Sequence, residues 1–138
     1  MPRLLLAALL AAASGGCLAE TWSVGSLASY HLKRNGQNEI NLGAGIERRL
    51  DERWGLVAGG YNNSSGDLTL YGGATRTLWR SGSMHLRAMA AAATGYERAL
   101  IVIPAAVVSF EGRHAGVNVG LIPAAGGVLF LQFKLRLD

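Results

Sequence analysis

Two kinds of side chain in this sequence could cooperate in ester chemistry: the imidazole of His31 and a hydroxyl of the run Asn62-Asn63-Ser64-Ser65. A histidine within reach of a serine can accept the hydroxyl proton as that oxygen attacks an ester carbonyl. Either Ser64 or Ser65 could supply this hydroxyl. Alternatively, the run is an ordinary turn sequence without a chemical role. His85 and His114 are poorer candidates, because the first falls in a charged region and the second in a predicted turn. The chemistry therefore depends on a fold that brings residues 31 and 64 together.

The composition favours strands over helices. Half of the 138 residues are hydrophobic, 16% are charged and 19 are glycine. Globular chains carry about 25% charged residues and about 7% glycine, and each glycine inside a helix costs about 1 kcal/mol relative to alanine. A disordered tail is excluded, because it needs low hydrophobicity and high charge. The length fits one domain. The formal net charge of +4 comes from scattered bases, so we expect no nucleic-acid partner.

The first 19 residues have the layout of a secretory signal peptide. Arg3 precedes an apolar run over residues 4–13, and Cys17-Leu18-Ala19 ends the segment before a predicted cleavage site. The apolar run is too short to span a bilayer. Lipidation of Cys17 is a weaker alternative, because Ser14 stands where a leucine-type residue is expected. The mature chain over residues 20–138 then has no cysteine, which excludes disulfide and thiol chemistry.

Polar and apolar residues alternate with the period of a β-strand along most of the mature chain. In the last segment, the odd-numbered residues from Leu129 to Leu137 are apolar, whereas Gln132, Lys134 and Arg136 lie on the other face. Turn signals divide the chain into eight predicted strands. They cover residues 21–33, 38–49, 54–62, 68–79, 84–94, 99–109, 115–122 and 128–137. Strands of about ten residues with short turns are typical of the smallest outer-membrane barrels.

The predicted fold class is all-β, an eight-stranded antiparallel transmembrane β-barrel of the outer membrane. A soluble barrel has the same period but buries its apolar face. The membrane version is favoured because the apolar faces are aliphatic, and the opposite faces carry charges that would crowd a small soluble core. Closure also leaves no strand edge in lipid. We expect an interfacial girdle of the aromatic residues near strand ends, namely Trp22, Tyr30, Trp54, Tyr61, Trp79 and Tyr96.

If both termini lie in the periplasm, strand direction places each inward side chain by depth. Inward residues near the outer rim are small or apolar: Gly43, Tyr71, Gly73, Met89, Ala91, Ala93 and Phe130. Inward residues near the periplasmic end are polar: Glu47, Arg49, Thr77, His85, Arg87, Lys134 and Arg136. An apolar upper half could hold a hydrocarbon chain, at about 0.8 kcal/mol per methylene; alternatively, its small residues pack against one another. The same rule places His31 and Ser64 at the outer rim, with one strand between the strand that ends at His31 and the strand that leads to Ser64.

Eight motifs occur in order along the mature chain: Tyr30-His31, Asn38-Glu39 with Gly43 and Gly45, Tyr61 with Asn63-Ser64, Tyr71-Gly72-Gly73, Thr94-Gly95, Ile103-Pro104, Ile122-Pro123 and Gln132-Phe133. This set resembles the PagP-type lipid A palmitoyltransferases of the Gram-negative outer membrane. The resemblance implies transfer of palmitate from a phospholipid donor to a lipid A acceptor. We expect a monomer in outer-membrane lipid that uses no metal or cofactor.

The resemblance also implies roles for individual residues. His31 takes the base role and Ser64 the hydroxyl role, while Asn63 stands where the family pattern has Asp. An asparagine can orient a histidine but cannot stabilise an imidazolium by charge, so Asp67 or Glu39 could supply the missing carboxylate.

The acyl chain would be measured inside the barrel. The expected contacts are Tyr71, Met89 and Phe130, with Gly73 on the floor. Pro104 and Pro123 lack an N–H and so weaken the strand ladder on two neighbouring strands. A lipid tail could enter there sideways, or the two are ordinary strand-end prolines.

Two other functions remain open. Lipid A 3-O-deacylases are also small barrels with a serine and a histidine, but they carry the two side by side on one strand, whereas His31 is followed by Leu32. A non-enzymatic structural barrel would have long outer loops and a wholly polar lumen, and the predicted outer joints are short.

Overall fold

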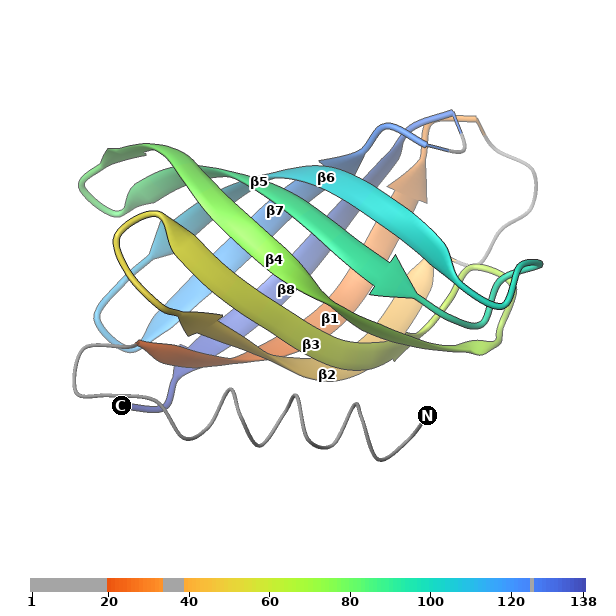
Figure 1. The fold of residues 1–138 in the computed structure, drawn as a ribbon, viewed down its shortest axis with the longest axis horizontal. Coiled ribbons are helices and arrows are strands. Elements are labelled where there is room, and N and C mark those ends of the chain that lie inside the picture. Colours follow the sequence, from red (N-terminus) through yellow and green to blue (C-terminus); the bar gives the residue numbers. More distant parts are fainter. Residues whose placement is uncertain (1–19, 34–38, 125) are drawn as a thin grey trace.

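The computed structural model describes residues 20–33, 39–124 and 126–138; the predicted signal peptide lies outside this part. Eight strands pair in chain order and close into one antiparallel barrel, with β1 against β8 (Figure 1). They are β1 Thr21–His31, β2 Ile40–Arg49, β3 Trp54–Asn62, β4 Leu68–Ser81, β5 Met84–Ala93, β6 Ile101–Glu111, β7 Ala115–Ile122 and β8 Val128–Arg136. The predicted barrel and its eight strands are confirmed. The described part of the chain holds no helix with the length and hydropathy needed to cross a bilayer.

The outward surface of the barrel is apolar along most strands. On β8, Leu129, Leu131, Phe133 and Leu135 are exposed, whereas Lys134 between them is fully buried. On β6, Val102 is 71% exposed. Apolar surface of this extent is unfavourable in water and suited to lipid, and a closed barrel satisfies its backbone hydrogen bonds internally, as lipid requires.

The two ends of the barrel differ in what they carry. The end that holds Glu20 and Asp138 is called the proximal end here (Figure 1). The opposite end is the distal rim, where β1 ends and where the β3–β4, β5–β6 and β7–β8 connections lie. The described residues that could carry chemistry at the distal rim therefore come from several separate connections.

Strand β1 does not alternate regularly. Its register with both neighbours shifts between Ser26 and Ala28, which is a β-bulge. Before the bulge the even-numbered residues face the lumen, and after it Ser29 and His31 do. Trp22 is consequently 1% exposed, and the Lys134 ammonium lies 4.7 Å from the centroid of its ring. The girdle prediction is therefore wrong for Trp22.

The remaining predicted girdle residues divide into two groups. Tyr30, Trp54 and Trp79 are exposed on the outside of the barrel. Tyr61 and Tyr96 instead line the lumen near the distal rim, where their hydroxyls are 2.6 Å apart. The girdle prediction is wrong for these two tyrosines, because β3 presents its odd-numbered residues inward and the β5–β6 connection places Tyr96 against Tyr61.

An ionic cluster fills the proximal half of the lumen; its members are Glu47, Arg49, His85, Arg87, Glu111 and Lys134. Arg87 donates two hydrogen bonds to the Glu47 carboxylate, one of them at 3.1 Å. The Lys134 ammonium lies 3.3 Å from Glu47 and also contacts Glu111, which accepts a 2.7 Å bond from Arg49. Glu111 was predicted in a turn and belongs to the cluster because β6 continues two residues further.

Candidate active site

His31 and Ser64 lie side by side at the distal rim. His31 is the last residue of β1, Ser64 follows β3 by two residues, and β2 runs between these strands. The His31 Nε2 atom is 3.0 Å from Ser64 Oγ, and His31 is 6% exposed. A serine hydroxyl at hydrogen-bond distance from an imidazole is the arrangement of an activated nucleophile and its base. Of the two serines left open by the sequence, Ser64 is the one bonded to His31.

The asparagine before Ser64 shapes the turn and does not contact the imidazole. Asn63 is fully buried, and its amide makes four hydrogen bonds. Its oxygen accepts from the N–H groups of Ser65 (2.9 Å) and Asp67 (3.1 Å), and its nitrogen donates to Thr69 Oγ1 (3.1 Å) and the Gly95 carbonyl (2.7 Å). These bonds occupy both donors and both acceptor sites of the amide. The predicted catalytic contact of Asn63 with His31 is therefore replaced by a structural role in the turn that carries Ser64.

His31 has no carboxylate partner in the described residues. Its Nδ1 atom is buried and makes no hydrogen bond there. The prediction that Asp67 or Glu39 supplies the missing carboxylate is not met in the structure. Asp67 is exposed, and its backbone N–H is bonded to the Asn63 side chain. Within the part of the chain that the structure describes, the arrangement is a serine–histidine pair without a third acidic member.

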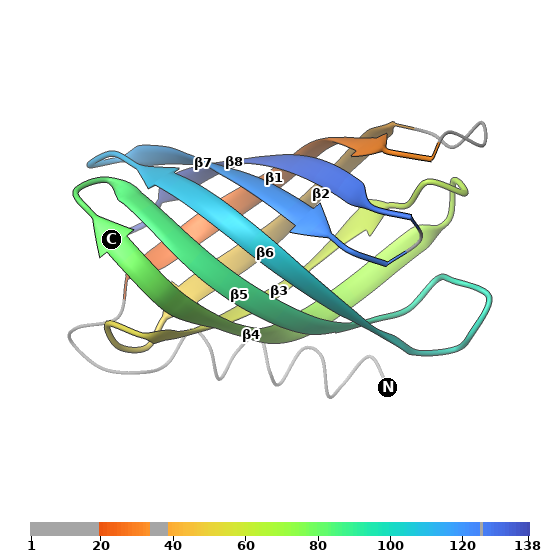
Figure 2. The same cartoon turned by 90° about the horizontal axis from the view of Figure 1, so that it is seen from above.

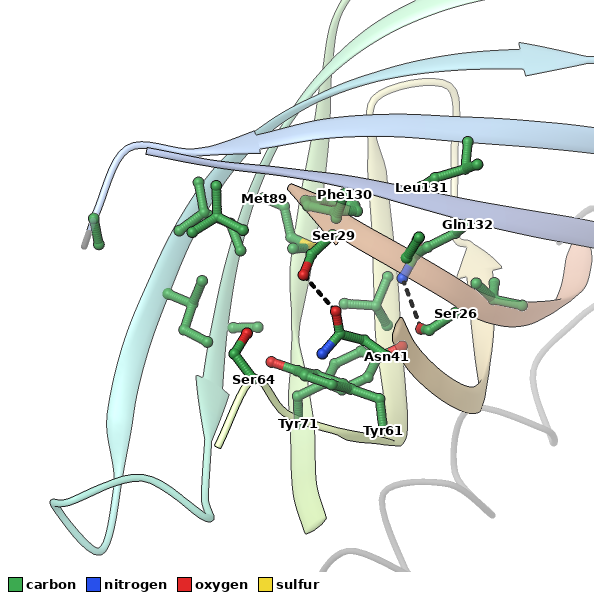
Figure 3. Close-up of a pocket in the computed structure, with 18 of the residues that line it drawn as sticks. Ser26, Ser29, Asn41, Tyr61, Ser64, Tyr71, Met89, Phe130, Leu131 and Gln132 are labelled. Carbon is green, nitrogen blue, oxygen red and sulfur yellow. Dashed lines mark hydrogen bonds between the residues drawn. The ribbon is translucent and has the colours of Figure 1, made fainter. Parts of the chain in front are cut away.

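A cavity of about 360 Å³ lies between this pair and the ionic cluster (Figure 3). Its size falls within the ~300–1,000 Å³ typical of ligand pockets. The lining is mainly apolar and includes Val24, Ile46, Met89, Ala91, Ile103 and Phe130, while Gln132 and Glu47 line it toward the cluster. The predicted division of the lumen, apolar at the distal rim and ionic below, is confirmed. Tyr71, Met89 and Phe130 line the cavity as predicted.

Glycines on neighbouring strands make room for the aromatic walls of the cavity. A Cβ atom on Gly45 or Gly59 would lie 2.7 or 2.8 Å from the Tyr71 hydroxyl oxygen. A Cβ atom on Gly120 would lie 2.0 Å from Cζ of Phe130. Gly120 is paired with Phe130 across β7 and β8, so the ring rests directly on the glycine backbone. Gly120 thus leaves room for the Phe130 ring, and Gly45 and Gly59 leave room both for the Tyr71 hydroxyl and for the close approach of the β2 and β3 backbones.

Gly73 does not form the floor of the cavity, contrary to the prediction. It is not among the residues that line the cavity. A Cβ atom on Gly73 would lie 2.1 Å from the carbonyl oxygen of Ala90 and 2.5 Å from Cα of Ala91. Gly73 instead allows the backbones of β4 and β5 to approach closely.

This contact predicts that Gly73→Ala prevents the barrel from assembling, because backbone cannot yield as a side chain can. The loss of stability should exceed the ~1–3 kcal/mol typical of overpacking. The control is Gly72→Ala, whose nearest Cβ contact would be an ordinary 3.9 Å from the Val57 carbonyl oxygen. The folded fraction is measured from the mobility of unheated samples on detergent gels. Equal folded fractions for the two variants would contradict this role for Gly73.

Pro104 and Pro123 lie beside the cavity and do not line it. Both are exposed. The first pair between β6 and β7 joins Ala106 to Leu121, so residues 101–105 of β6 have no partner on β7. Figure 2 shows β6 continuing past the end of β7. Pro104, which was predicted to weaken the ladder, lies within this stretch, and Pro123 directly follows β7; Ile101, Ile103 and Ile122 line the cavity there.

Sequence reasoning missed Ser29, Asn41, Tyr61 and Tyr96 as cavity residues. The inward phase of Val57 on β3 could have identified Tyr61, because the two residues share a face. Tyr96 lies in a connection, where alternation carries no information. Within the described ranges, no group of three or more histidine, cysteine, aspartate or glutamate side chains could hold a metal ion.

The comparisons with known proteins bear on the fold. No family model and no curated protein matches the sequence. The chain is similar to a solved structure described as "De novo design of transmembrane beta-barrels", with a TM-score of 0.71 and 13% identity over 85% of this chain and 95% of that chain. It is also similar to the NMR structure of a de novo designed barrel, TMB2.3, with a TM-score of 0.67 and 16% identity over 87% of this chain and 96% of that chain. The fold is therefore that of a transmembrane β-barrel.

Proposed function

We propose that this chain is an acyltransferase of the Gram-negative outer membrane that moves a palmitoyl chain from a phospholipid to lipid A. The observation that carries the proposal is the 3.0 Å contact between His31 and Ser64 at the mouth of an apolar cavity. The pair supplies a nucleophile and a base, and the cavity supplies a place for a hydrocarbon chain. The ordered motifs that resemble the PagP-type transferases support the choice of substrates.

The two side chains can carry both halves of a transfer. His31 Nε2 accepts the Ser64 proton as Oγ attacks the ester carbonyl of the phospholipid. The bond to the glycerol oxygen breaks, that oxygen takes the proton from His31, and the acyl group remains on Ser64. A lipid A hydroxyl then attacks the acyl-serine, gives its proton to His31 and forms the new ester. Ser64 recovers the proton as it leaves.

The cavity favours a long saturated chain over a polar substrate. Each methylene that leaves water contributes about 0.8 kcal/mol. The ionic cluster limits the depth, because Glu47 lines the cavity at its proximal end and is held by Arg87 and Lys134. A chain that filled the cavity would place its ester beside Ser64.

We propose that a lipid tail reaches this cavity from the membrane beside β6. Residues 101–105 of β6 pair with β5 but have no ladder of hydrogen bonds on the side of β7, and Ile101 and Ile103 of this stretch line the cavity. Pro104 lies within this stretch and cannot donate a ladder bond. The donor phospholipid would enter there without leaving the bilayer.

The proposal is tested by mass spectra of lipid A from a Gram-negative host with and without this protein. We expect one added palmitoyl chain when the protein is present, and a purified protein that transfers the chain from phospholipid to lipid A in mixed micelles. Loss of an existing chain would identify a deacylase. Unchanged lipid A in both experiments would favour a structural barrel and overturn the proposal.

A substitution at Gly120 should shorten the acyl chain that the protein accepts. In Gly120→Ala the new methyl group displaces the Phe130 ring, because a Cβ atom there would lie 2.0 Å from Cζ of the ring, and we expect the ring, which lines the cavity, to move into it. We expect myristoyl or lauroyl transfer to replace palmitoyl transfer in the lipid A spectra.

The matched control is Gly25→Ala, where the nearest contact of the new atom would be 3.8 Å from the Phe133 carbonyl oxygen. Gly25→Ala should retain the wild-type chain length. A Gly120→Ala variant that still prefers palmitoyl chains would show that the Phe130 ring does not bound the acyl site.

A further inference from the structure

We propose that Asn41 is a positioning residue that sets the separation of His31 and Ser64. This inference rests on the proposed function, since the separation matters only if the two side chains act together. Asn41 lies on β2, the strand between the one that carries His31 and the one that leads to Ser64. It is 6% exposed and lines the cavity.

The Asn41 amide connects both neighbouring strands at the distal rim. Its oxygen accepts a hydrogen bond from the Ser29 hydroxyl, two residues before His31 on β1. Its nitrogen donates a 2.9 Å bond to the carbonyl of Asn62, two residues before Ser64. Figure 3 shows Ser29, Asn41 and Ser64 around the same end of the cavity. One side chain therefore links the two segments that carry the reacting groups.

On the β3 side, the strand ladder does not make this connection. The pairing of β2 with β3 ends at Gly43 and Tyr61, so Asn62 lies beyond the last backbone pair of those strands. On the other side, β1 and β2 stay bonded through the backbone, because the Ser29 N–H donates a 2.8 Å bond to the Glu39 carbonyl. The Asn41 side chain therefore connects the end of β3 to a segment that the ladder already holds. Its two hydrogen bonds help to set how far the Ser64 turn lies from β1.

Neither partner could be held by an apolar residue at position 41. An aliphatic side chain would leave the Asn62 carbonyl and the Ser29 hydroxyl, which bond to Asn41 in part-buried surroundings, without this partner. The turn at Ser64 would then relax relative to His31. A misplacement of about 1 Å between reacting groups can cost about 10²-fold in rate.

The test compares three variants of the full chain in detergent micelles with palmitoyl phospholipid and lipid A. Asn41→Asp keeps the acceptor for Ser29 but places an oxygen against the Asn62 carbonyl, and we expect kcat to fall by about 10²-fold with little change in KM. Ser29→Ala should lower kcat in the same direction, and Ser29→Thr, which keeps the hydroxyl, should restore it. The control is Ser109→Ala, which removes a buried hydroxyl from beside Arg87 in the proximal half.

A second readout does not depend on acyl transfer. The ¹⁵N chemical shift of His31 Nε2 reports its bond to Ser64, and His114 serves as an internal reference. We expect the His31 shift to move in Asn41→Asp and Ser29→Ala and to stay in Ser109→Ala. A wild-type protein that transfers no acyl chain overturns the proposed function, whereas this shift still tests the position of Ser64.

Two results would overturn the role of Asn41. One is an unchanged His31 shift in both Asn41→Asp and Ser29→Ala. The other is a shift that moves while kcat stays at the wild-type value, because the separation would then not control the rate. If Asn41→Asp does not fold, the Ser29 pair of variants decides the question by the same two measurements.

Discussion

Lipid A from cells that express Ser64→Ala or His31→Ala should carry no palmitoyl chain beyond the host's own. In the proposed mechanism, Ser64 is the nucleophile and His31, whose Nε2 atom is 3.0 Å from its Oγ atom, is the base. Loss of a positioned general base lowers a rate by about 10²–10⁴-fold. With the purified protein, the wild type should also gain the mass of one acyl chain on Ser64 during turnover, and neither variant should gain this mass.

The controls for this experiment are chosen from the opposite end of the barrel. Ser83→Ala and His114→Ala change the same residue types in exposed proximal turns. Both should leave the lipid A spectrum as in the wild type. If Ser64→Ala and His31→Ala transfer palmitate as well as these controls do, the site assignment is wrong. An active wild type without an acyl-serine would instead indicate direct transfer, with Ser64 binding the developing oxyanion.

Replacing Glu47 by leucine should destabilise the barrel by about 3–5 kcal/mol, the cost of removing one partner of a buried ion pair. Arg87 and Lys134 are buried beside this carboxylate, and Arg87 has its only ion pair among the described residues with Glu47. The substitution therefore leaves a guanidinium in the lumen without a countercharge. The free energy of unfolding is measured by urea titration in micelles, with the fluorescence of buried Trp22 as a probe.

Two further variants show whether the unpaired charge causes the loss of stability in Glu47→Leu. Asp138→Asn removes a carboxylate from an exposed pair with Arg136 and should change stability by about 0–1 kcal/mol. The double variant Glu47→Leu with Arg87→Met removes both charges and should recover much of the loss, because apolar replacements of buried pairs are often neutral. A double variant no more stable than Glu47→Leu would indicate that lost packing, not the unpaired charge, dominates.

Alternation along a strand was sufficient to predict the parts of the fold that repeat. The apolar odd-numbered residues of β8 face outward over the whole strand, as predicted, because no bulge interrupts it. The same reasoning misplaced Trp22, because one extra residue in β1 reverses the faces upstream of it. A bulge depends on both neighbouring strands, so the β1 sequence alone does not reveal it.

At the candidate site, too, the sequence pattern predicted one part of the arrangement and tertiary contacts decided the other. Up-and-down strand order placed His31 and the 62–65 turn at one end of the barrel with a single strand between theirs. The choice of Ser64 over Ser65 depends on the turn, which Asn63 shapes through bonds to Thr69 on β4 and to Gly95 in the β5–β6 connection. Gly73 also could not be assigned from its phase, because an inward residue on a strand can meet either open space or a neighbouring backbone.

By itself the sequence determined an eight-stranded barrel, the faces that meet lipid, the divided lumen and the shared end of the histidine and the serines. These properties follow from the period of two along each strand and from the order of the strands. Four features were decided only by the tertiary structure. They are the β1 bulge, the glycines that leave room for Tyr71 and Phe130, the hydrogen bonds of Asn41 to its neighbouring strands, and the end of β6 that has no partner on β7. Each of these is a relation between strands, fixed by register and by the distance between backbones, and no single strand encodes it.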